Sequence, residues 1–280
     1  MDLLEFIAAE ATGDLFPWAA QVRAAERFGL TLGRVEETAL THGLMPARYQ
    51  RNRQTISVER QLHLFRSRAV IIGSGGLGGY LVEELARLGV GNLVVVDPDI
   101  FEEHNLNRQI LSSPALLGRS KSAVAAERVA EINPAVTITP LQVAFSRENG
   151  REILTRADVV LDGLDSITTR LELVDLCREL SIPLVHGAIG GWYGQIASQL
   201  PGDDISPSLF GSWSEPRGIE TRLGNPSFTP AVVASLQVAE ACKILLGEGE
   251  SLRNRMIFVN LLDMEFDEVL LEPAPAAVGE

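Results

Sequence analysis

A glycine-rich turn at residues 73–78, with the sequence GSGGLG, has the composition of a phosphate-binding site. It joins an apolar β-type segment to a helix with apolar periodicity, and Gly73, Gly75 and Gly78 fit the G-x-G-x-x-G dinucleotide fingerprint. These glycines, with Gly76 between them, let the backbone turn tightly, approach a phosphate and pack helix against strand. Free N–H groups at the helix N-terminus favour an anion, so the turn predicts nucleotide binding.

An acidic side chain ends the next apolar strand, NLVVVDPD. Asp97 follows Gly73 by 24 residues, a position from which its carboxylate can accept the ribose hydroxyls of a nucleotide. Strand, glycine turn, helix, strand and acid in this order are more specific than a glycine motif alone. The order favours a nucleotide site over a tight βα turn with only a structural role.

Cations and amides follow the acidic strand end. The segment HNLNRQ contains Asn105, Arg108 and Gln109, and Lys121 begins the next predicted helix. Arginine offers a planar fork and lysine a point charge, and both can stabilise charge that builds on phosphoryl oxygens. Two cations beside a phosphate-binding turn suit a triphosphate; the alternative is that both are solvated surface charges. The P-loop sequence G-x-x-x-x-G-K-[ST] does not occur in the chain.

The residues named above lie in a sequence in which predicted strands and helices alternate. We predict a helix from about Ser120 to Ile132, followed by strands and helices in turn up to the strand PLVHGAI, which implies right-handed crossovers and a parallel sheet. From about Trp192, the segments YGQIASQL, MIFVNLL and EFDEVLLE predict antiparallel strands, with a helix from about Thr229 to Leu246. The predicted fold class is α/β, a Rossmann-like doubly wound sheet with a parallel N-terminal half and antiparallel C-terminal strands.

The chain divides into three predicted regions. Residues 1–45 read as a helical N-terminal extension, 46–273 as the nucleotide-binding domain, and 274–280 as a disordered tail. Within the domain, the apolar positions of residues 50–65 suit a helix ahead of the first strand. Residues 201–227 form a Gly/Pro/Ser-rich stretch that predicts a long loop with a functional or mobile role.

Composition limits the class of protein and its partners. The formal net charge of -13 argues against DNA or bulk nucleic acid, which bind to basic faces. Cys177 and Cys242 are the only cysteines and lie in helical patterns, so neither a disulfide framework nor a cysteine zinc site is expected. The chain has no run of 18 apolar residues and no basic flank at its start, which predicts a cytoplasmic protein without membrane insertion.

The ordered motifs resemble those of the ThiF/MoeB/HesA family, relatives of the ubiquitin-activating enzymes. The resemblance runs from about Arg48 to Glu268 and comprises RYQRN at 48–52, GSGGLG at 73–78, VVDPD at 95–99, NLNRQ at 105–109, GRSKS at 118–122, LDGLD at 161–165 and the helix SLQVAEACKILLG. It implies an adenylyltransferase that uses ATP and Mg²⁺ to adenylate the C-terminal Gly-Gly carboxylate of a small ubiquitin-like sulfur-carrier protein, releasing pyrophosphate. Molybdopterin, thiamine or cysteine synthesis is the implied setting, and a homodimer the implied assembly.

The resemblance also assigns residues to the nucleotide. Asp97 would hold the adenosine ribose, and Asp99 belongs to the same motif. Asn105 and Gln109 would complete the polar wall of the site. The glycine turn would receive the phosphates.

Catalysis is implied for four further residues. Arg108 and Lys121 would bind the triphosphate and steady the pentavalent α-phosphate. Asp165, at the carboxyl end of a parallel strand, would hold Mg²⁺. Arg51 would reach the phosphates from the second protomer, with Arg53 as its neighbouring alternative. The carrier's carboxylate is already a nucleophile, so positioning and charge neutralisation would supply the catalysis.

The chain departs from the family pattern in three places. It lacks the two C-x-x-C pairs that hold zinc in many relatives, so no zinc is expected. Residues 201–227 lack the crossover-loop cysteine of relatives that form a thioester or persulfide, and Cys177 and Cys242 are expected to be buried, so the chemistry is predicted to end at the acyl-adenylate. Ser166 replaces the asparagine that usually follows the magnesium aspartate, and Asp162 is expected to be structural.

Other functions share part of this pattern. An NAD-dependent oxidoreductase would use the same glycine turn and Asp97, but the histidines at 42, 63, 104 and 186 offer no evident catalytic pairing. A nucleotide-binding scaffold without activity is opposed by Arg108, Lys121 and Asp165. A family member could also adenylate a tRNA base or a peptide, and the negative charge argues against tRNA.

Overall fold

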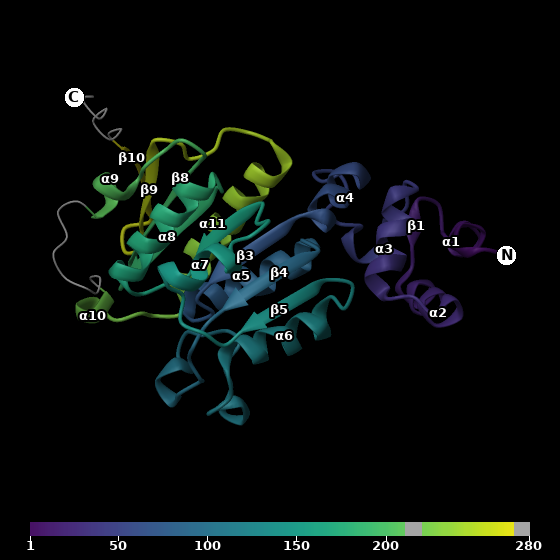
Figure 1. Ribbon diagram of the computed structural model, residues 1–280, viewed down its shortest axis with the longest axis horizontal. Helices are drawn as coiled ribbons and strands as arrows, with labels where there is room; N and C mark the ends of the chain where they lie inside the picture. The colour runs from purple at the N-terminus through teal and green to yellow at the C-terminus, as the bar shows by residue number, and fades with distance from the viewer. Residues whose placement is uncertain (211–219, 272–280) are drawn as a thin grey trace.

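The computed structural model describes residues 1–210 and 220–271 of the 280-residue chain. Within them an eight-stranded sheet has the order β10-β9-β8-β7-β6-β3-β4-β5 (Figure 1). Its strands are β3 (Arg68–Ile72), β4 (Asn92–Val96), β5 (Thr137–Leu141), β6 (Val159–Asp162), β7 (Leu184–Gly190), β8 (Tyr193–Gln199), β9 (Arg255–Asn260) and β10 (Glu265–Leu270). Strands β3 to β7 are parallel, and β8, β9 and β10 are antiparallel, as the sequence predicted.

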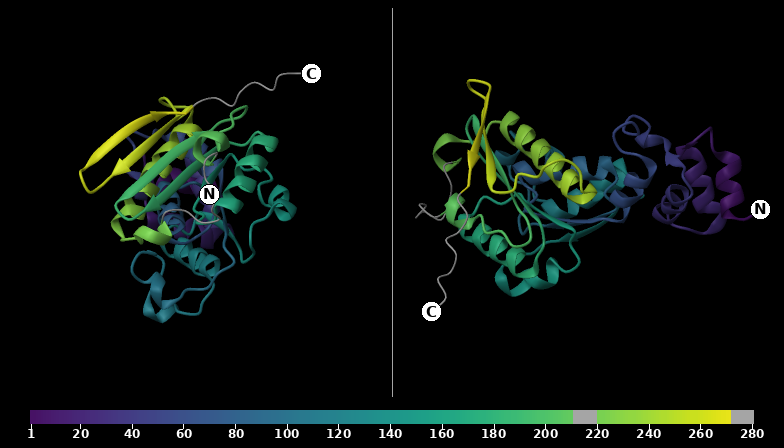
Figure 2. Two further views of the ribbon diagram at one scale, coloured as in Figure 1. Left: turned by 90° about the vertical axis from the view of Figure 1, so that its left-hand side faces the viewer. Right: turned by 90° about the horizontal axis from the view of Figure 1, so that it is seen from above.

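Helices cover both faces of the sheet, which explains the almost continuous apolar character of its central strands. One face carries α5 (Gly76–Leu88), α6 (Lys121–Ile132) and α11 (Phe228–Leu246), and the other carries α7 (Arg147–Ile153) and α8 (Ile167–Leu180) (Figures 1 and 2). Successive residues of β3 serve opposite faces: Ile71 packs in the first core, and Val70 and Ile72 pack in the second.

Helix α11 is long and apolar enough to cross a membrane by length and composition. Half of the relevant window is buried within the protein, and its side chains Val238 and Ala241 belong to the core that α5 shares. The apolar character of α11 is accounted for by this packing.

Three helices precede the sheet and form a small unit with its own core. They are α1 (Leu3–Glu10), α2 (Trp18–Phe28) and α3 (Leu32–Thr41), and the short strand β1 (Leu15–Phe16) pairs in parallel with β2 (Met45–Pro46). Phe6, Phe16 and Val35 lie at its centre. We call α1, α2, α3 and β1 the N-terminal unit; it lies beside the amino ends of the parallel strands (Figure 2).

Two predicted elements differ from the structure. The helix expected over 50–65 begins only at α4 (Val58–Arg66), because the Ser57 hydroxyl accepts a hydrogen bond from the Arg60 N–H and caps the helix there. The stretch 201–227 contains two short helices, α9 (Ser206–Phe210) and α10 (Glu220–Leu223), where a loop was predicted. Residues 211–219 and the predicted tail at 274–280 lie outside the described residues.

The strand order creates a crevice at one point of the sheet. The chain runs from β3 outward through β4 to β5 and then returns to place β6 on the other side of β3. The connections leaving β3 and β6 therefore diverge to opposite faces, and ligands bind outside the carboxyl ends of strands at such switch points.

Candidate active site

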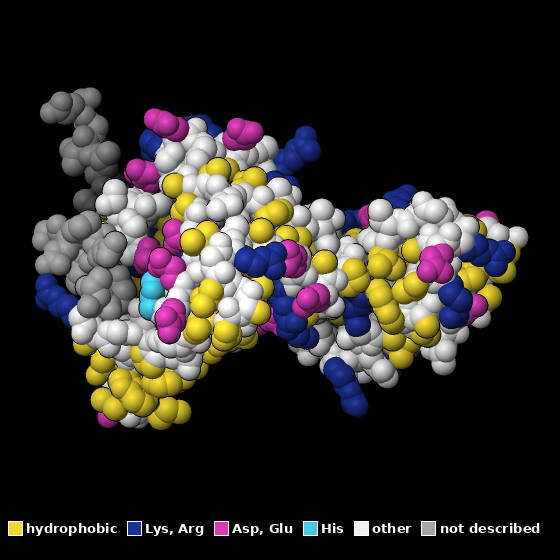
Figure 3. Space-filling model, turned by 90° about the horizontal axis from the view of Figure 1, so that it is seen from below, with side chains coloured by type: hydrophobic (Ala, Val, Ile, Leu, Met, Phe, Trp, Pro, Cys, Tyr) yellow, Lys and Arg dark blue, Asp and Glu magenta, His cyan; other side chains and the backbone are white. Residues whose placement is uncertain are grey.

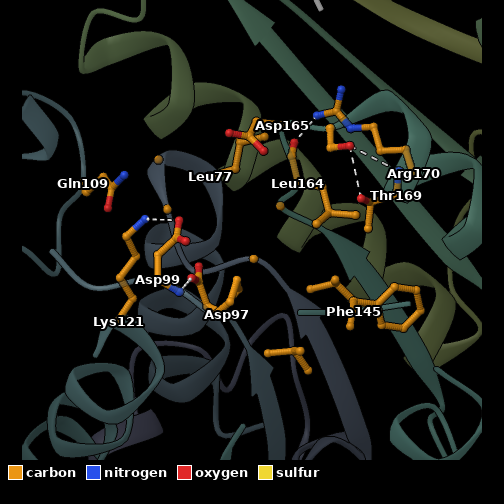
Figure 4. Close-up of a pocket in the computed structure, with 18 of the residues that line it drawn as sticks. Leu77, Asp97, Asp99, Gln109, Lys121, Phe145, Leu164, Asp165, Thr169 and Arg170 are labelled. Carbon is orange, nitrogen blue, oxygen red and sulfur yellow. Dashed lines mark hydrogen bonds and ion pairs between the residues drawn. The ribbon is translucent and has the colours of Figure 1, made fainter. Parts of the chain in front are cut away.

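A cavity of about 300 Å³ lies at this switch point, at the carboxyl ends of β3, β4 and β6 (Figure 4). The predicted residues that line it are Gly73, Gly75, Gly76, Asp97, Asp99, Arg108, Gln109, Lys121 and Asp165. Gly78, Asn105 and Arg51 do not line it. Lys121 and Asp99 lie on one side, and Asp165 and Arg170 lie on the other (Figure 4).

Glycines at the turn are required by close backbone packing. Gly73 has φ +89°, and a Cβ there would lie 2.6 Å from the Gly163 carbonyl oxygen. A Cβ on Gly78 would lie 1.9 Å from the Gly73 carbonyl oxygen. Gly78 therefore serves helix–strand packing, while Gly75 and Gly76 bring the N-terminus of α5 to the cavity, where its N–H groups can meet an anion.

The two acids after β4 have different surroundings. Asp97 is buried, and its carboxylate accepts hydrogen bonds from the Ser74 N–H at 2.7 Å, the Ser74 hydroxyl at 3.1 Å and the Asp99 N–H at 2.9 Å. Asp99 is exposed and pairs with the buried Lys121, its carboxylate 3.0 Å from Nζ. Asp97 thus ties the glycine turn to the strand end, and Asp99 holds the lysine that faces the cavity. The sequence predicted both acids but not this division between them.

Arg108 and Gln109 extend from the loop that follows Asp99. The Arg108 guanidinium donates to the His104 carbonyl and to Oδ1 of Asn107, each at 2.9 Å. Burial lowers the pKa of Arg108 and the nearby Asp165 carboxylate raises it; the group remains a cation. The buried Oε1 of Gln109 has no hydrogen-bond partner among the described residues, which leaves an acceptor beside the cavity.

Asn105, to which the family resemblance assigns a place in the polar wall, is not among the residues that line the cavity. Its side chain is buried, and its Oδ1 accepts a hydrogen bond from the Glu102 N–H at 3.0 Å. This bond closes the short turn at residues 102–106, which precedes Arg108 and Gln109. Asn105 therefore stabilises the start of the loop from which Arg108 and Gln109 extend.

Asp165 offers a single exposed carboxylate on the cavity wall. Among the described residues no group of three or more His, Cys, Asp or Glu side chains could hold a metal. Mg²⁺ commonly binds one or two carboxylates together with substrate phosphates and waters, so the donor set fits a Mg²⁺ that arrives with a nucleotide. Ser166, the residue that departs from the family pattern, caps α8 by accepting from the Thr169 N–H at 3.3 Å.

A buried ionic cluster supports the strand end that carries Asp165. Asp162 accepts from Nδ1 of His186 at 2.7 Å, lies 3.2 Å from Nε of Arg170, and accepts from the Leu164 N–H at 2.9 Å. Arg170 also donates to the carbonyls of Leu164 and Gly187. Burial opposes ionisation of Asp162, but Arg170 and His186 hold its pKa below the usual value, whereas burial lowers the pKa of His186. Asp162 is therefore structural, as predicted.

Several cavity residues were not predicted from the sequence. Phe145 lies with Ile72 and Val96 on an apolar wall that suits a planar base, and Asn225 comes from the segment before α11. These residues are distant in sequence and carry no motif. Arg170 could have been found, because it is a charged residue on the face of α8 that is otherwise apolar and buried, one helical turn before Leu173 and Val174.

Arg51 lies far from the cavity of its own chain. It follows Tyr49, which sits beside Gly89 at the C-terminal end of α5: a Cβ on Gly89 would lie 2.4 Å from the tyrosine hydroxyl. The cavity is at the other end of this 13-residue helix, a distance of roughly 20 Å. Arg51 therefore lies near the end of α5 that is opposite the cavity of its own chain.

Both cysteines lie away from the cavity wall. Burial raises the pKa of Cys177, and burial raises the pKa of Cys242 to about 11. Both side chains are therefore thiols at neutral pH, which are poor nucleophiles.

Known proteins are similar to this chain in sequence and in fold. The sequence matches the ThiF family over residues 49–277. The SAMP-activating enzyme E1 of Haloferax volcanii is 38% identical over 216 residues, covering 76% of this chain and 80% of that protein. The sulfur carrier protein adenylyltransferase of Thermus thermophilus is 34% identical over 229 residues, covering 79% and 84%.

Solved structures agree at the level of the fold. A crystal structure of PaaA superposes with a TM-score of 0.69 at 18% identity, covering 80% of this chain and 73% of that one. Escherichia coli MccB, crystallised with AMPCPP and MccA, superposes with a TM-score of 0.68 at 20% identity, covering 82% and 72%.

Proposed function

This chain belongs to the ThiF family and is an adenylyltransferase of that type, and on this premise we propose that its substrates are ATP and a small ubiquitin-like sulfur-carrier protein ending in Gly-Gly. The terminal carboxylate of the carrier would attack the α-phosphorus of ATP. The bond from that phosphorus to the bridging oxygen breaks, pyrophosphate leaves, and an acyl-adenylate forms. Names of the two sulfur-carrier and SAMP-activating relatives support this substrate class.

The observation that carries the proposal is the meeting of two cations and one free carboxylate around the N-terminus of α5. Arg108, Lys121 and Asp165 come from three separate segments and line one cavity. A diester pyrophosphate would need less positive charge than this, whereas a triphosphate concentrates negative charge that two cations and a metal can balance.

The remaining cavity residues fit the nucleoside. The apolar wall of Ile72, Val96 and Phe145 would receive the adenine. Asp97 and Asp99 stand at the strand end where ribose hydroxyls are held in this fold, and Gln109 offers an unpaired acceptor next to them. Adenine and ribose would thereby be fixed while the phosphates lie over the glycine turn.

Positioning and charge neutralisation would supply the catalysis, because the attacking carboxylate needs no activating base. Lys121 is buried and held by Asp99, so its ammonium is preorganised toward the phosphates. Arg108 would pair with phosphate oxygens through its planar fork. Mg²⁺, held through Asp165 and the phosphates, would supply further charge neutralisation.

The active assembly we propose is a cytoplasmic homodimer in which Arg51 of each chain enters the phosphate site of the other. Arg51 is exposed and remote from its own cavity, which supports action in trans. The reaction we propose ends at the acyl-adenylate, since the raised pKa values of Cys177 and Cys242 oppose a thioester step.

Calorimetry with two nucleotides tests the choice of ATP. ATP with Mg²⁺ should bind, and NAD should neither bind nor compete, because the charges of Arg108 and Lys121 suit a triphosphate better than a pyrophosphate diester. Arg108→Ala is the matched variant and should weaken ATP binding while the unfolding midpoint stays unchanged. Binding of NAD with no signal from ATP would overturn the proposal in favour of an oxidoreductase.

A further inference from the structure

The segment that carries Arg51 is joined to the N-terminal unit along its backbone. We call residues 45–53 the arginine segment. Its first two residues form β2, which pairs with β1 in the register Leu15 with Met45. The Met45 N–H also donates to the Asp14 carbonyl at 2.9 Å. The beginning of the segment is therefore part of the N-terminal unit's structure.

Two side chains then fix the middle of the arginine segment between the N-terminal unit and the sheet domain. The Tyr49 hydroxyl donates to Glu36 of α3 at 2.8 Å and accepts from Asn133, at the end of α6, at 2.8 Å. Arg48 donates to Gln21 of α2 at 2.9 Å and also to Asn133. Tyr49 and Glu36 are fully buried, so these bonds are shielded from water.

Arg48 is further constrained on its other sides. Its guanidinium lies 3.4 Å from a carboxylate oxygen of Glu36 and stacks 4.9 Å from the centre of the Trp18 ring in α2. The ion pair, the hydrogen bonds and the ring contact together hold the Arg48 guanidinium at the junction between the N-terminal unit and the sheet domain. Lys and Arg side chains are visible where the N-terminal unit joins the rest of the chain (Figure 3).

The end of the segment separates its two remaining arginines. The Arg53 guanidinium contacts both carboxylate oxygens of Asp14, at 2.9 and 3.1 Å, and so returns to the N-terminal unit. Arg51 is exposed and has no hydrogen bond or ion pair with any part of the chain that the structure describes. Fixed residues therefore flank one arginine that is free to bind an anion.

We propose that the N-terminal unit is a positioning element that presents Arg51 to the phosphate site of a second copy of the chain. The inference rests on the proposed function, in which Arg51 acts in trans, and adds that contacts with the N-terminal unit hold the backbone on both sides of Arg51. A long side chain loses conformational freedom when it binds, and a backbone already fixed at Tyr49 and Arg53 lowers that cost. Tyr49, Arg48 and Asp14 act here as positioning residues that never touch the nucleotide.

Mixing of variants with low activity tests this role, because a hybrid dimer shows which of its two chains carries the defect. The test variant is Tyr49→Phe with Asp14→Ala, which keeps the buried ring and removes contacts on both sides of Arg51. Exchange of labelled pyrophosphate into ATP, dependent on the carrier, should fall by about 10-fold to 100-fold. Glu10→Gln is the matched control: it breaks an ion pair with Arg23 inside the same unit and should leave the rate unchanged.

The pattern of rescue identifies the function of the unit. Mixed with Arg108→Ala, the test variant should regain activity, because its own cavity is intact and the partner supplies a well-held Arg51. Mixed with Arg51→Ala it should stay inactive, since neither chain then presents the arginine. Unfolding midpoints of all variants establish that the compared proteins are folded.

Three results would overturn the inference. These are an unchanged rate in the test variant, rescue of that variant by Arg51→Ala, or failure of Arg108→Ala to rescue it while the pair Arg51→Ala and Arg108→Ala does regain activity. If that reference pair also stays inactive after subunit exchange is demonstrated, the trans arginine of the proposed function fails together with the inference.

Discussion

Asp162 and Asp165 stand three residues apart at the end of one strand, in opposite surroundings. Asp162 is 1% exposed and its carboxylate bonds to His186, Arg170 and the Leu164 N–H. Asp165 is exposed at the cavity, where no described side chain forms a hydrogen bond or ion pair with it. The same residue type is therefore used twice, once with its charge balanced inside the protein and once with its charge available.

The same contrast extends to the neighbouring cations. Arg170 pairs with Asp162 and donates hydrogen bonds to two backbone carbonyls. Arg108 and Lys121 border the cavity, where an anion can bind beside them. Charges balanced within the protein hold the strand ends in place. Charges that are only partly balanced are available for a ligand, and substitution of residues from each group tests this difference.

The two aspartates should separate activity from stability, with the largest effects of any substitution. Asp165→Ala should abolish pyrophosphate exchange with little change in unfolding free energy, because the triphosphate loses its metal. Asp162→Ala should lower the unfolding free energy by about 3–5 kcal/mol, because it leaves Arg170 buried without its counter-ion. Exchange assays and urea unfolding of both variants check this. A stable, inactive Asp162→Ala protein would break the comparison.

Lys121→Ala tests a cation that belongs to the cavity group. Its ammonium is held by Asp99 but still faces the cavity, so we expect exchange to fall by roughly 10²–10³-fold, as for loss of another preorganised donor. Steady-state rates should be measured at matched folded concentration. Arg128→Ala is a suitable control, because that partly exposed arginine pairs with Glu83 away from the cavity. Equal losses in both variants would contradict the assignment.

The cysteines belong with the buried group and should matter only to packing. Replacing Cys177 and Cys242 together by alanine should leave carrier-dependent exchange largely intact and lower the unfolding free energy by about 1–3 kcal/mol. Rates and unfolding curves of the double variant give both quantities. A carrier–enzyme thioester trapped on the wild type and cleaved by thiol would show that the chemistry continues past the adenylate.

The smallest predicted effect is a pH dependence of stability from His186. Its folded pKa is lowered by burial, so the unfolded chain binds the proton first, and the stability present above about pH 6.5 is lost as the pH falls. The slope for one proton is at most about 1.4 kcal/mol per pH unit.

Comparison with His186→Gln isolates this contribution. Glu36 acts with the opposite sign, because burial raises its folded pKa and favours folding at low pH, and it is present in both proteins. Unfolding free energies at about pH 7.5 and about pH 5.5 should differ more in the wild type than in the variant. Equal differences would show that protonation of His186 does not lower the unfolding free energy.

Much of the site could be predicted because its residues follow strand ends in a fixed order. The glycine turn, the acids after β4, Arg108, Lys121 and Asp165 are all placed by local motifs on a sheet whose alternation is visible in the sequence. Their meeting follows from topology, since carboxyl ends of neighbouring parallel strands converge. Asp97 and Asp99 differ in their surroundings because Asp97 bonds to Ser74 and Asp99 bonds to Lys121, and no sequence motif specifies these contacts.

Features that depend on contacts distant in sequence were not predicted. Phe145 and Asn225 reach the cavity only after the chain folds, and Asn105 accepts a hydrogen bond within its own turn and does not line the cavity. Helix α4 begins later than periodicity suggested because a serine cap competes with continued helix. The hydrogen bonds and the ion pair that hold Arg48 and Tyr49 likewise come from residues of α2, α3 and the end of α6, which are far apart in the sequence.

The most direct test of the proposed function is exchange of labelled pyrophosphate into ATP with a purified sulfur-carrier protein. The exchange should require both Mg²⁺ and the carrier, and it should disappear when the carrier's terminal glycine is removed, because the attacking carboxylate no longer reaches the α-phosphate. Exchange that proceeds equally with the truncated carrier, or no exchange with any Gly-Gly-ending carrier while a peptide or RNA supports it, would contradict the assignment of substrate.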